Sequence, residues 1–345
     1  MALMSAIPTT SPALVTLSDI QAAAVRIRDL VVRTPLLPCA WAEDGRPLWL
    51  KPESLQATGA FKLRGASNAL AQLDAEQRAR GVVAQSSGNH AQAVAYAAQR
   101  LGVRATIVMP DTTPAVKLEA TRGFGAEVVI VPPAERDIRP HELVAEHGYG
   151  HIPPYDDARI IAGQGTAGLE IAEDLLASAG AGLGEAAGAP DAASDLVLVP
   201  VSGGGLISGV ATAIKALSPD TRVIAVEPEL AADAAESFRT GERVTWTPEQ
   251  TYRTIADGLR TTSLGVLPFE HFRRYVDGVV TVSEDEIAEA VRVLGRKSRL
   301  VAEPSGAVTT AAYLFHAAEL PAASRTVAVV SGGNVDPAKY REYYG

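Results

Sequence analysis

The sequence has a single cysteine, Cys39, among 345 residues. One cysteine excludes an intrachain disulfide and a zinc site built from several thiolates of the same chain. No apolar run approaches the roughly 20 residues of a membrane-spanning helix. The N-terminal stretch has neither the early basic residues nor the long apolar segment of a secretory signal. We therefore expect a cytoplasmic protein with no membrane partner.

Basic residues are also too few to favour nucleic acid. The chain has 31 Lys and Arg against 40 Asp and Glu, a formal net charge of -9, whereas phosphate backbones attract basic surfaces. Its hydrophobic content of 47% over this length is enough to bury a large core, typically divided into two domains.

Short stretches rich in Val, Ile and Ala alternate with helical patterns. Ser18 and Gln21 predict a capping box that opens a helix reaching about Val32. Continuous apolar strands between helices indicate an α/β fold with parallel sheets covered on both faces. The Gly/Ala-rich stretch 177–194 reads as a surface loop. The predicted strands are 81–85, 105–110, 126–131, 195–201, 222–228, 278–282 and the beginning of 326–334, with helices at 89–102, from 205 and at 284–299.

The stretch "ATGAFKLRGA" (57–66) places one lysine, Lys62, behind Phe61 and among residues with little bulk. Most lysines are simply solvated. The alternative is that the small neighbours leave room for a bound group and that the amine of Lys62 reacts with it.

Three glycine-rich turns follow predicted strands, at the sheet edge where α/β proteins bind ligands. "SSGNH" (86–90) offers hydroxyl, amide and imidazole groups beside free helix N–H groups, which suits a small carboxylate but also fits an ordinary helix cap. "VSGGGLISG" (201–209) lets the backbone approach a phosphate at a helix N-terminus. "SGGN" (331–334) could be only a tight turn.

The second turn also permits a dinucleotide site, with Glu227 at the end of the next strand as the ribose-binding acid. A nicotinamide enzyme, however, gives no reason for the third turn or for the surroundings of Lys62. Pyridoxal phosphate uses all of these features, because it needs a lysine for its aldehyde, a donor-rich turn for its phosphate and a side chain at its ring nitrogen.

With these motifs the chain resembles the fold-type-II pyridoxal-phosphate enzymes, in particular the serine racemase and serine/threonine dehydratase family. The resemblance covers about residues 18–337 and rests on "KPESLQATGAFKLRGA", "SSGNHAQAVAYAA", "IIAGQGTAGLEI", "VPVSGGGL", "EPELAAD", "ADGLRTTSLG", "VAEPSGAV" and "SGGNVD". It implies a tryptophan-synthase-β-like fold of two open, mostly parallel sheets with the cofactor in a cleft between domains. The large domain would comprise 1–71 and 158–345, and the small domain 72–157.

The resemblance also assigns roles to residues. Lys62 would bond to the cofactor aldehyde and act as the base, and Ser87 would be the second acid/base of a racemase. The other cofactor contacts implied are Phe61, Asn89, Ser202, Gly203, Gly204, Gly205, Leu206 and Ser331. The substrate contacts implied are Ser86, Ser87, Asn89, His90 and Arg136. Two positions depart from the family: Ser202 replaces a common fourth glycine, and Tyr155 replaces phenylalanine or asparagine.

"EPELAAD" resembles the family's divalent-metal motif. Glu227 and Asp233 would supply carboxylates and Ala231 a backbone oxygen, a set suited to Mg²⁺, Mn²⁺ or Ca²⁺. Two carboxylates six residues apart are otherwise usually a solvated acidic loop.

The expected reaction is loss of water from a small β-hydroxy amino acid of the L-serine or L-threonine type, giving a 2-keto acid and ammonia, with racemase activity as an addition. The alternatives are a 3-hydroxyaspartate dehydratase, favoured if Arg136 points inward, and a β-replacement synthase. A ligand-binding protein with a dead site is disfavoured by the intact Lys62. From the family alone we expect a homodimer.

Overall fold

The computed structural model describes residues 13–113, 115–180 and 194–344, and these contain two sheets. The larger sheet has six strands in the order β1-β2-β10-β7-β8-β9. Only β1 runs antiparallel to its neighbour. The strands are β1 (Leu37–Pro38), β2 (Leu48–Pro52), β7 (Leu196–Pro200), β8 (Arg222–Pro228), β9 (Gly278–Val282) and β10 (Thr326–Val330).

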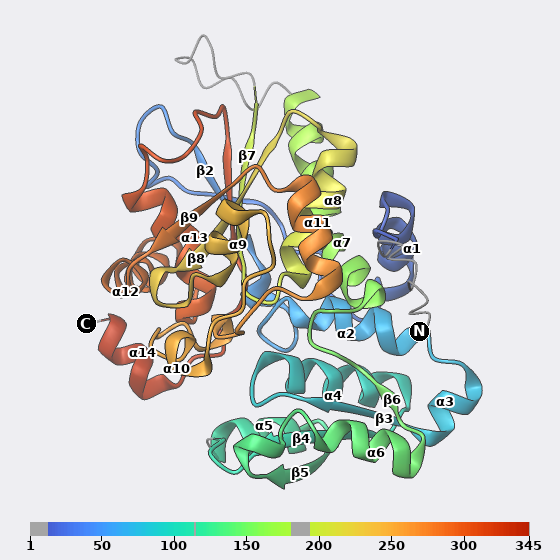
Figure 1. Cartoon of the computed structure of the whole chain (residues 1–345). Helices are drawn as coiled ribbons and strands as arrows, with labels where there is room; N and C mark the ends of the chain where they lie inside the picture. Colours follow the sequence, from blue (N-terminus) through green and yellow to red (C-terminus); the bar gives the residue numbers. More distant parts are fainter. Residues whose placement is uncertain (1–12, 114, 181–193, 345) are drawn as a thin grey trace, which may run out of the picture.

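The smaller sheet has four parallel strands in the order β5-β4-β3-β6. It lies in the lower part of Figure 1, below the larger sheet. Its strands are β3 (Val82–Gln85), β4 (Ala105–Pro110), β5 (Glu127–Val131) and β6 (Gly150–His151).

Helices cover both faces of the larger sheet. The side chains of β7 alternate, so Val197 and Val199 pack with α7 (Ala158–Gly180), α8 (Gly205–Leu217) and α11 (Val266–Tyr275). Leu196 and Leu198 face the opposite side and pack with α12 (Glu284–Val293) and α13 (Pro304–Phe315). A sheet buried on both faces explains why these strands are continuously apolar.

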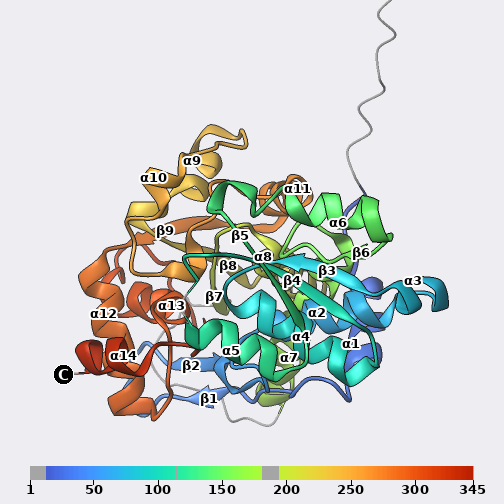
Figure 2. The same cartoon turned by 90° about the horizontal axis from the view of Figure 1, so that it is seen from below.

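The smaller sheet is covered in the same way. On one face it packs with α2 (Lys62–Ala71), α4 (Asn89–Leu101) and α5 (Ala115–Gly123), and on the other with α6 (Arg139–His147). Figure 2 shows this sheet and its helices from below. Its strands all lie between residues 82 and 151, inside the range predicted for the small domain. We keep the boundaries at 71/72 and 157/158 as a proposal.

The remaining helices are shorter or peripheral. None of the helices in the described ranges combines the length and apolarity needed to cross a membrane. They are α1 (Leu17–Ile27), α3 (Ala75–Arg80), α9 (Asp233–Thr240), α10 (Pro248–Thr251) and α14 (Pro337–Tyr344), together with the 3-10 turns η1 (Glu53–Leu55), η2 (Pro133–Glu135), η3 (Glu229–Ala231) and η4 (Asp257–Leu259) and the π-helical turn η5 (Leu294–Ser298).

The predicted α/β class with two mostly parallel sheets is confirmed, and all seven predicted strands are present within one or two residues at their starts. The short strands β1 and β6 and the buried β2 were not predicted. The predicted cap of the first helix is wrong: Thr16 and Asp19 form the capping box, and the α-helix ends at Ile27 rather than near Val32. Thr16 is the N-cap because its extended backbone allows its hydroxyl to accept the N–H of Asp19.

The predicted loop at 177–194 is partly wrong, because α7 continues through Gly180. The rest of that prediction, 181–193, lies outside the described residues.

Candidate active site

Lys62 is the first residue of α2. Two residues before it, Ala60 forms an isolated β-bridge with Gly332, which follows β10. Its Nζ donates a hydrogen bond to the carbonyl oxygen of Pro154 at 2.7 Å and lies 5.1 Å from the centre of the Phe61 ring. Desolvation lowers the pKa of the Lys62 amine to about 8. Part of the amine population is therefore neutral and nucleophilic near neutral pH.

Two of the small neighbours of Lys62, Gly59 and Gly65, are closely packed by other parts of the protein. A Cβ at Gly59 would collide with the side-chain amide of Asn334, and Gly59 has φ +71, which only glycine adopts easily. A Cβ at Gly65 would lie 2.5 Å from Nε2 of Gln164 on α7. At Gly59 and Gly65, therefore, neighbouring side chains of the protein fill the space beside the glycine. That the small residues around Lys62 leave room for a bound group stays a prediction.

The glycine-rich turn at 203–205 leads directly into α8. Gly204 has φ +88 and is the N-cap residue of α8. The ring of Tyr155 occupies the place into which a side chain of Gly203 would project. The backbone N–H groups of the turn therefore lie at the positive end of a 13-residue helix, with Tyr155 packed against the turn.

The loop before α4 brings together the predicted carboxylate contacts. The Ser86 hydroxyl accepts the N–H of Gly88 at 3.1 Å. Within the described parts of the chain, the Ser87 hydroxyl has no hydrogen-bond partner. The Nε2 of His90 donates to the carbonyl of Ile152 at 2.9 Å, and burial followed by the charge of Lys62 lowers the pKa of His90 to about 3. His90 is therefore neutral.

Asn89 is held by two residues that the sequence reasoning missed as site residues. Its Nδ2 donates to Oε1 of Glu303 at 2.6 Å, and its Oδ1 accepts from Nδ2 of Asn334 at 2.8 Å. These bonds fix the direction of the amide and leave its second N–H available. Burial raises the pKa of the Glu303 carboxyl to about 8. The motif "VAEPSGAV" contains Glu303, but nothing local distinguishes this carboxylate from a solvated one.

Ser331 is buried at the end of β10. Its hydroxyl donates to the carbonyl of Ser305 at 3.3 Å, a long bond that the rotating hydroxyl can exchange for another acceptor. Its own carbonyl accepts the N–H of Phe61 at 3.0 Å, which ties the third glycine-rich turn to the residue before Lys62.

Arg136 follows η2, and its Nε is buried without a hydrogen-bond partner among the described residues. Its nearest carboxylate, Asp137, is 3.9 Å away, at the limit of an ion pair. The pKa of Tyr155 is raised first by burial, and the charge of Arg136 opposes that rise. Arg136 therefore lies within electrostatic range of the tyrosine that packs on the 203–205 turn.

Glu227 and Asp233 are both buried, Glu227 at the end of β8 and Asp233 at the beginning of α9. The two Glu227 oxygens accept the N–H groups of Ala234 and Ala235, whereas both Asp233 oxygens have no partner in the described chain. Burial and the Asp233 charge raise the pKa of Glu227, and burial raises that of Asp233 to about 7. Ala231 is buried in η3, between them in sequence.

No three His, Cys, Asp or Glu side chains among the described residues lie together as a metal site. A cation here would need the two carboxylates and backbone or water oxygens, as predicted with Ala231. The divalent cation is therefore a proposal.

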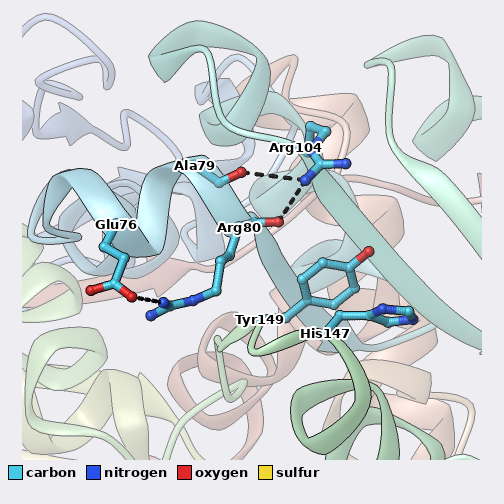
Figure 3. Close-up of a pocket in the computed structure, with 6 residues that line it drawn as sticks. All are labelled: Glu76, Ala79, Arg80, Arg104, His147 and Tyr149. Carbon is cyan, nitrogen blue, oxygen red and sulfur yellow. Dashed lines mark hydrogen bonds and ion pairs between the residues drawn. The ribbon is translucent and has the colours of Figure 1, made fainter.

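A hollow of 430 Å³ lies elsewhere, where α3 meets the strands and α6 of the smaller sheet (Figure 3). Arg104 in this hollow donates to the carbonyls of Ala79 and Arg80, and Arg80 pairs with Glu76. Arg104 caps the end of α3 and Arg80 forms an ion pair within α3, so the polar side chains of this hollow have a structural role. Its lining residues are Glu76, Ala79, Arg80, Arg104, His147 and Tyr149.

The chain is similar to several known proteins. Residues 27–332 match the family model described as pyridoxal-phosphate dependent enzyme. The chain is 40% identical over 329 residues to L-threo-3-hydroxyaspartate ammonia-lyase of Saccharomyces cerevisiae, covering 94% of this chain and 95% of that one.

Two solved structures share the fold. The threonine deaminase of T.th. is 46% identical with a TM-score of 0.83, covering 93% of this chain and 99% of that one. Serine racemase from Dictyostelium discoideum is 38% identical with a TM-score of 0.81, covering 94% and 100%. With a desolvated lysine, a glycine turn at a helix N-terminus and a match over nearly its whole length, this chain belongs to the family of pyridoxal-phosphate dependent enzymes.

Proposed function

We propose that this protein eliminates water from a small β-hydroxy amino acid of the L-serine or L-threonine type, releasing a 2-keto acid and ammonia. The observation that carries the proposal is the amine of Lys62, which is desolvated, has a pKa of about 8 and follows a residue bonded to Ser331. The names of the relatives, a threonine deaminase, a serine racemase and a hydroxyaspartate ammonia-lyase, support the substrate class.

The residues present fit pyridoxal phosphate. Lys62 would hold its aldehyde, the N–H groups of the 203–206 turn its phosphate, the spare N–H of Asn89 its ring oxygen, and Ser331 its ring nitrogen. When bound, the cofactor withdraws electrons from the α-carbon of the substrate and so acidifies the α-proton. A hydroxyl at the ring nitrogen, unlike a carboxylate, does not stabilise a protonated ring, which favours prompt elimination.

The protein groups then divide the work of binding and proton transfer. The N–H groups at the beginning of α4, with Ser86 and Ser87, would hold the α-carboxylate of the substrate. The neutral amine of Lys62 would accept the α-proton as general base. Neutral His90, bonded to Ile152, supports this loop without adding a charge to it.

Two measurements test the proposal. Borohydride reduction of the purified yellow protein should bleach it and leave the reduced cofactor covalently attached to Lys62. Attachment to any other residue would refute the assignment. Keto-acid release should then be assayed with L- and D-serine, L-threonine and both 3-hydroxyaspartate diastereomers. No keto acid from any of these substrates would refute the reaction.

The unpartnered hydroxyl of Ser87 supports an additional racemase activity, because it is free to exchange a proton. The change Ser87→Ala should abolish racemisation of serine and largely spare keto-acid release. Equal loss of both activities would show that Ser87 acts on neither face selectively.

A second candidate is 3-hydroxyaspartate as the preferred substrate, and the buried Nε of Arg136, which has no hydrogen-bond partner among the described residues, favours it. A guanidinium near the 203–205 turn can pair with a second carboxylate. Arg136→Leu should raise KM for 3-hydroxyaspartate at least tenfold and leave KM for L-serine nearly unchanged. Similar effects on both substrates would argue against this candidate.

We further propose a divalent cation, Mg²⁺ or Mn²⁺ and alternatively Ca²⁺, at Glu227, Asp233 and the Ala231 carbonyl. The two unpartnered buried oxygens of Asp233 support it. A cytoplasmic homodimer is also proposed, and sedimentation at several protein concentrations tests its assembly.

A further inference from the structure

Two hydroxyl side chains lie side by side next to the glycine turn. The Oγ of Ser202 is 2.5 Å from Oγ1 of Thr261, and the N–H of Thr261 donates to the same Ser202 oxygen at 3.2 Å. The N–H of Gly265 donates to the carbonyl of Gly203 at 3.0 Å, so the segment 261–265 is hydrogen-bonded at both of its ends to Ser202 and Gly203.

One of the two hydroxyl protons of this pair has no acceptor within the pair. Two hydroxyls contain two protons, and the bond between them uses one. Ser202 already accepts the N–H of Thr261. Its oxygen can therefore accept one more hydrogen bond, and its own proton can be donated once. Neither hydroxyl donates to another group in the described parts of the chain. Whichever hydroxyl donates within the pair, the other retains a proton for an outside acceptor.

The other hydroxyl near the turn is already used. The Ser208 hydroxyl, one turn into α8, donates to the carbonyl of Gly204 at 2.7 Å. Ser202, in contrast, directly precedes Gly203 and is half-buried. Ser202 is therefore a side-chain donor that directly precedes the turn in sequence and that no other group in the described parts of the chain, apart from Thr261, engages.

We propose that the Ser202–Thr261 pair donates its second proton to the phosphate of pyridoxal phosphate, adding a side-chain contact to the backbone cradle at 203–206. This inference rests on the proposed function, and it makes Thr261 a cofactor-binding residue. A phosphate dianion is a strong acceptor, so the bond would be charge-assisted. Thr261 also orients Ser202, since its N–H fixes the position of the serine oxygen.

The test compares pyridoxal phosphate with pyridoxal, which has the aldehyde but no phosphate. Dissociation constants of both would be measured by absorbance of the Lys62 adduct for the wild type, Ser202→Ala, Ser202→Gly and Thr261→Val. Loss of a charge-assisted bond should weaken pyridoxal phosphate roughly 10- to 100-fold in Ser202→Ala or Thr261→Val or both. Binding of pyridoxal should change less than about twofold. Thr240→Val, an exposed threonine on α9, is the control for loss of a hydroxyl.

Each other result overturns the inference. Equal pyridoxal phosphate affinity in all variants would show that the pair does not reach the phosphate. Tighter binding in Ser202→Gly would show that the serine only narrows the turn. A loss limited to KM for 3-hydroxyaspartate would assign the proton to a substrate carboxylate. If the wild type forms no adduct at Lys62, both the proposed function and the inference fail. If the wild type forms the adduct but the variants bind pyridoxal phosphate equally well, only the inference fails. Circular dichroism and thermal unfolding establish that each variant is folded.

Discussion

The amine of Lys62, the imidazole of His90 and the carboxyl of Glu303 all lie in surroundings with little water. Desolvation is the first cause of each shifted pKa: about 8 for Lys62, about 3 for His90 and about 8 for Glu303. In each case the shift favours the neutral form. Because these side chains are neutral, the N–H groups at helix N-termini are the groups available to hold anions. The neutral Lys62 amine is able to accept a proton.

The pKa of Lys62 predicts how the apoprotein takes up pyridoxal phosphate with pH. Only the neutral amine attacks an aldehyde, so the uptake rate should rise about tenfold per pH unit below pH 8 and level off above it. Stopped-flow absorbance between pH 6 and 10 measures this rate. Lys62→Ala should form no adduct, and a rate that still climbs tenfold per unit at pH 9–10 would show an ordinary, solvated lysine.

Glu303 predicts a pH-dependent stability difference. Its folded-state pKa of about 8 exceeds the value near 4.5 of an unperturbed glutamate, so its contribution is present below pH 4.5 and is lost as pH rises through 8. Glu303→Gln still accepts the Asn89 bond but cannot ionise. Between pH 5 and pH 9 the variant should gain about 2–4 kcal/mol in unfolding free energy relative to the wild type. Urea unfolding measures this, and a constant difference would mean that Glu303 ionises normally.

At the scale of elements, neighbouring side chains leave no room for a side chain in the 203–205 turn. The ring of Tyr155 lies against Gly203, while Leu264 and Pro268 lie 2.7 and 2.8 Å from a Cβ at Gly204. The turn has room for backbone only, and its N–H groups lie at the beginning of α8. The loop before α4 leads into a second helix N-terminus, and Ser331 follows the end of β10.

Gly203→Ala should therefore weaken both folding and cofactor binding. The added methyl would collide with the Tyr155 ring, at an expected cost of about 1–3 kcal/mol in unfolding free energy and a lower affinity for pyridoxal phosphate. Gly123→Ala is the matched control, because a Cβ there meets nothing within 4 Å. Adding Tyr155→Ala should restore part of the loss. No change in Gly203→Ala would contradict the packing described here.

Across the whole molecule, contacts between distant segments join the two sheets. Lys62 bonds to Pro154, Asn89 to Glu303, and Lys117 on α5 pairs with Asp257 at 2.8 Å. A buried cluster of Lys51, Glu53, Arg64 and Glu170 anchors α2 to α7, β2 and η1. The proposed reaction centre thus lies where both sheets contribute residues, and global stability bears directly on its geometry.

Removal of the proposed cation should lower global stability. Binding to Glu227 and Asp233 in the folded state alone would contribute about 2.7 kcal/mol at a cation concentration of about one hundred times Kd. Chelation should lower the thermal midpoint of the wild type, and readdition of Mg²⁺, Mn²⁺ or Ca²⁺ should restore it. The double variant Glu227→Gln, Asp233→Asn should not respond. An equal response in that variant would locate the cation elsewhere.

The sequence by itself determined the fold class, the positions of seven strands and the family, because apolar periodicity, glycine turns and motif order are local or collinear signals. Only the tertiary structure decided which side chains meet. The Asn89–Glu303 bond joins residues 214 positions apart, and the Ser202–Thr261 pair spans 59. Likewise, Gly59 and Gly65 are packed against Asn334 and Gln164, which no local pattern places there. Desolvation, which sets the pKa of Lys62, depends on packing from segments far apart in the chain.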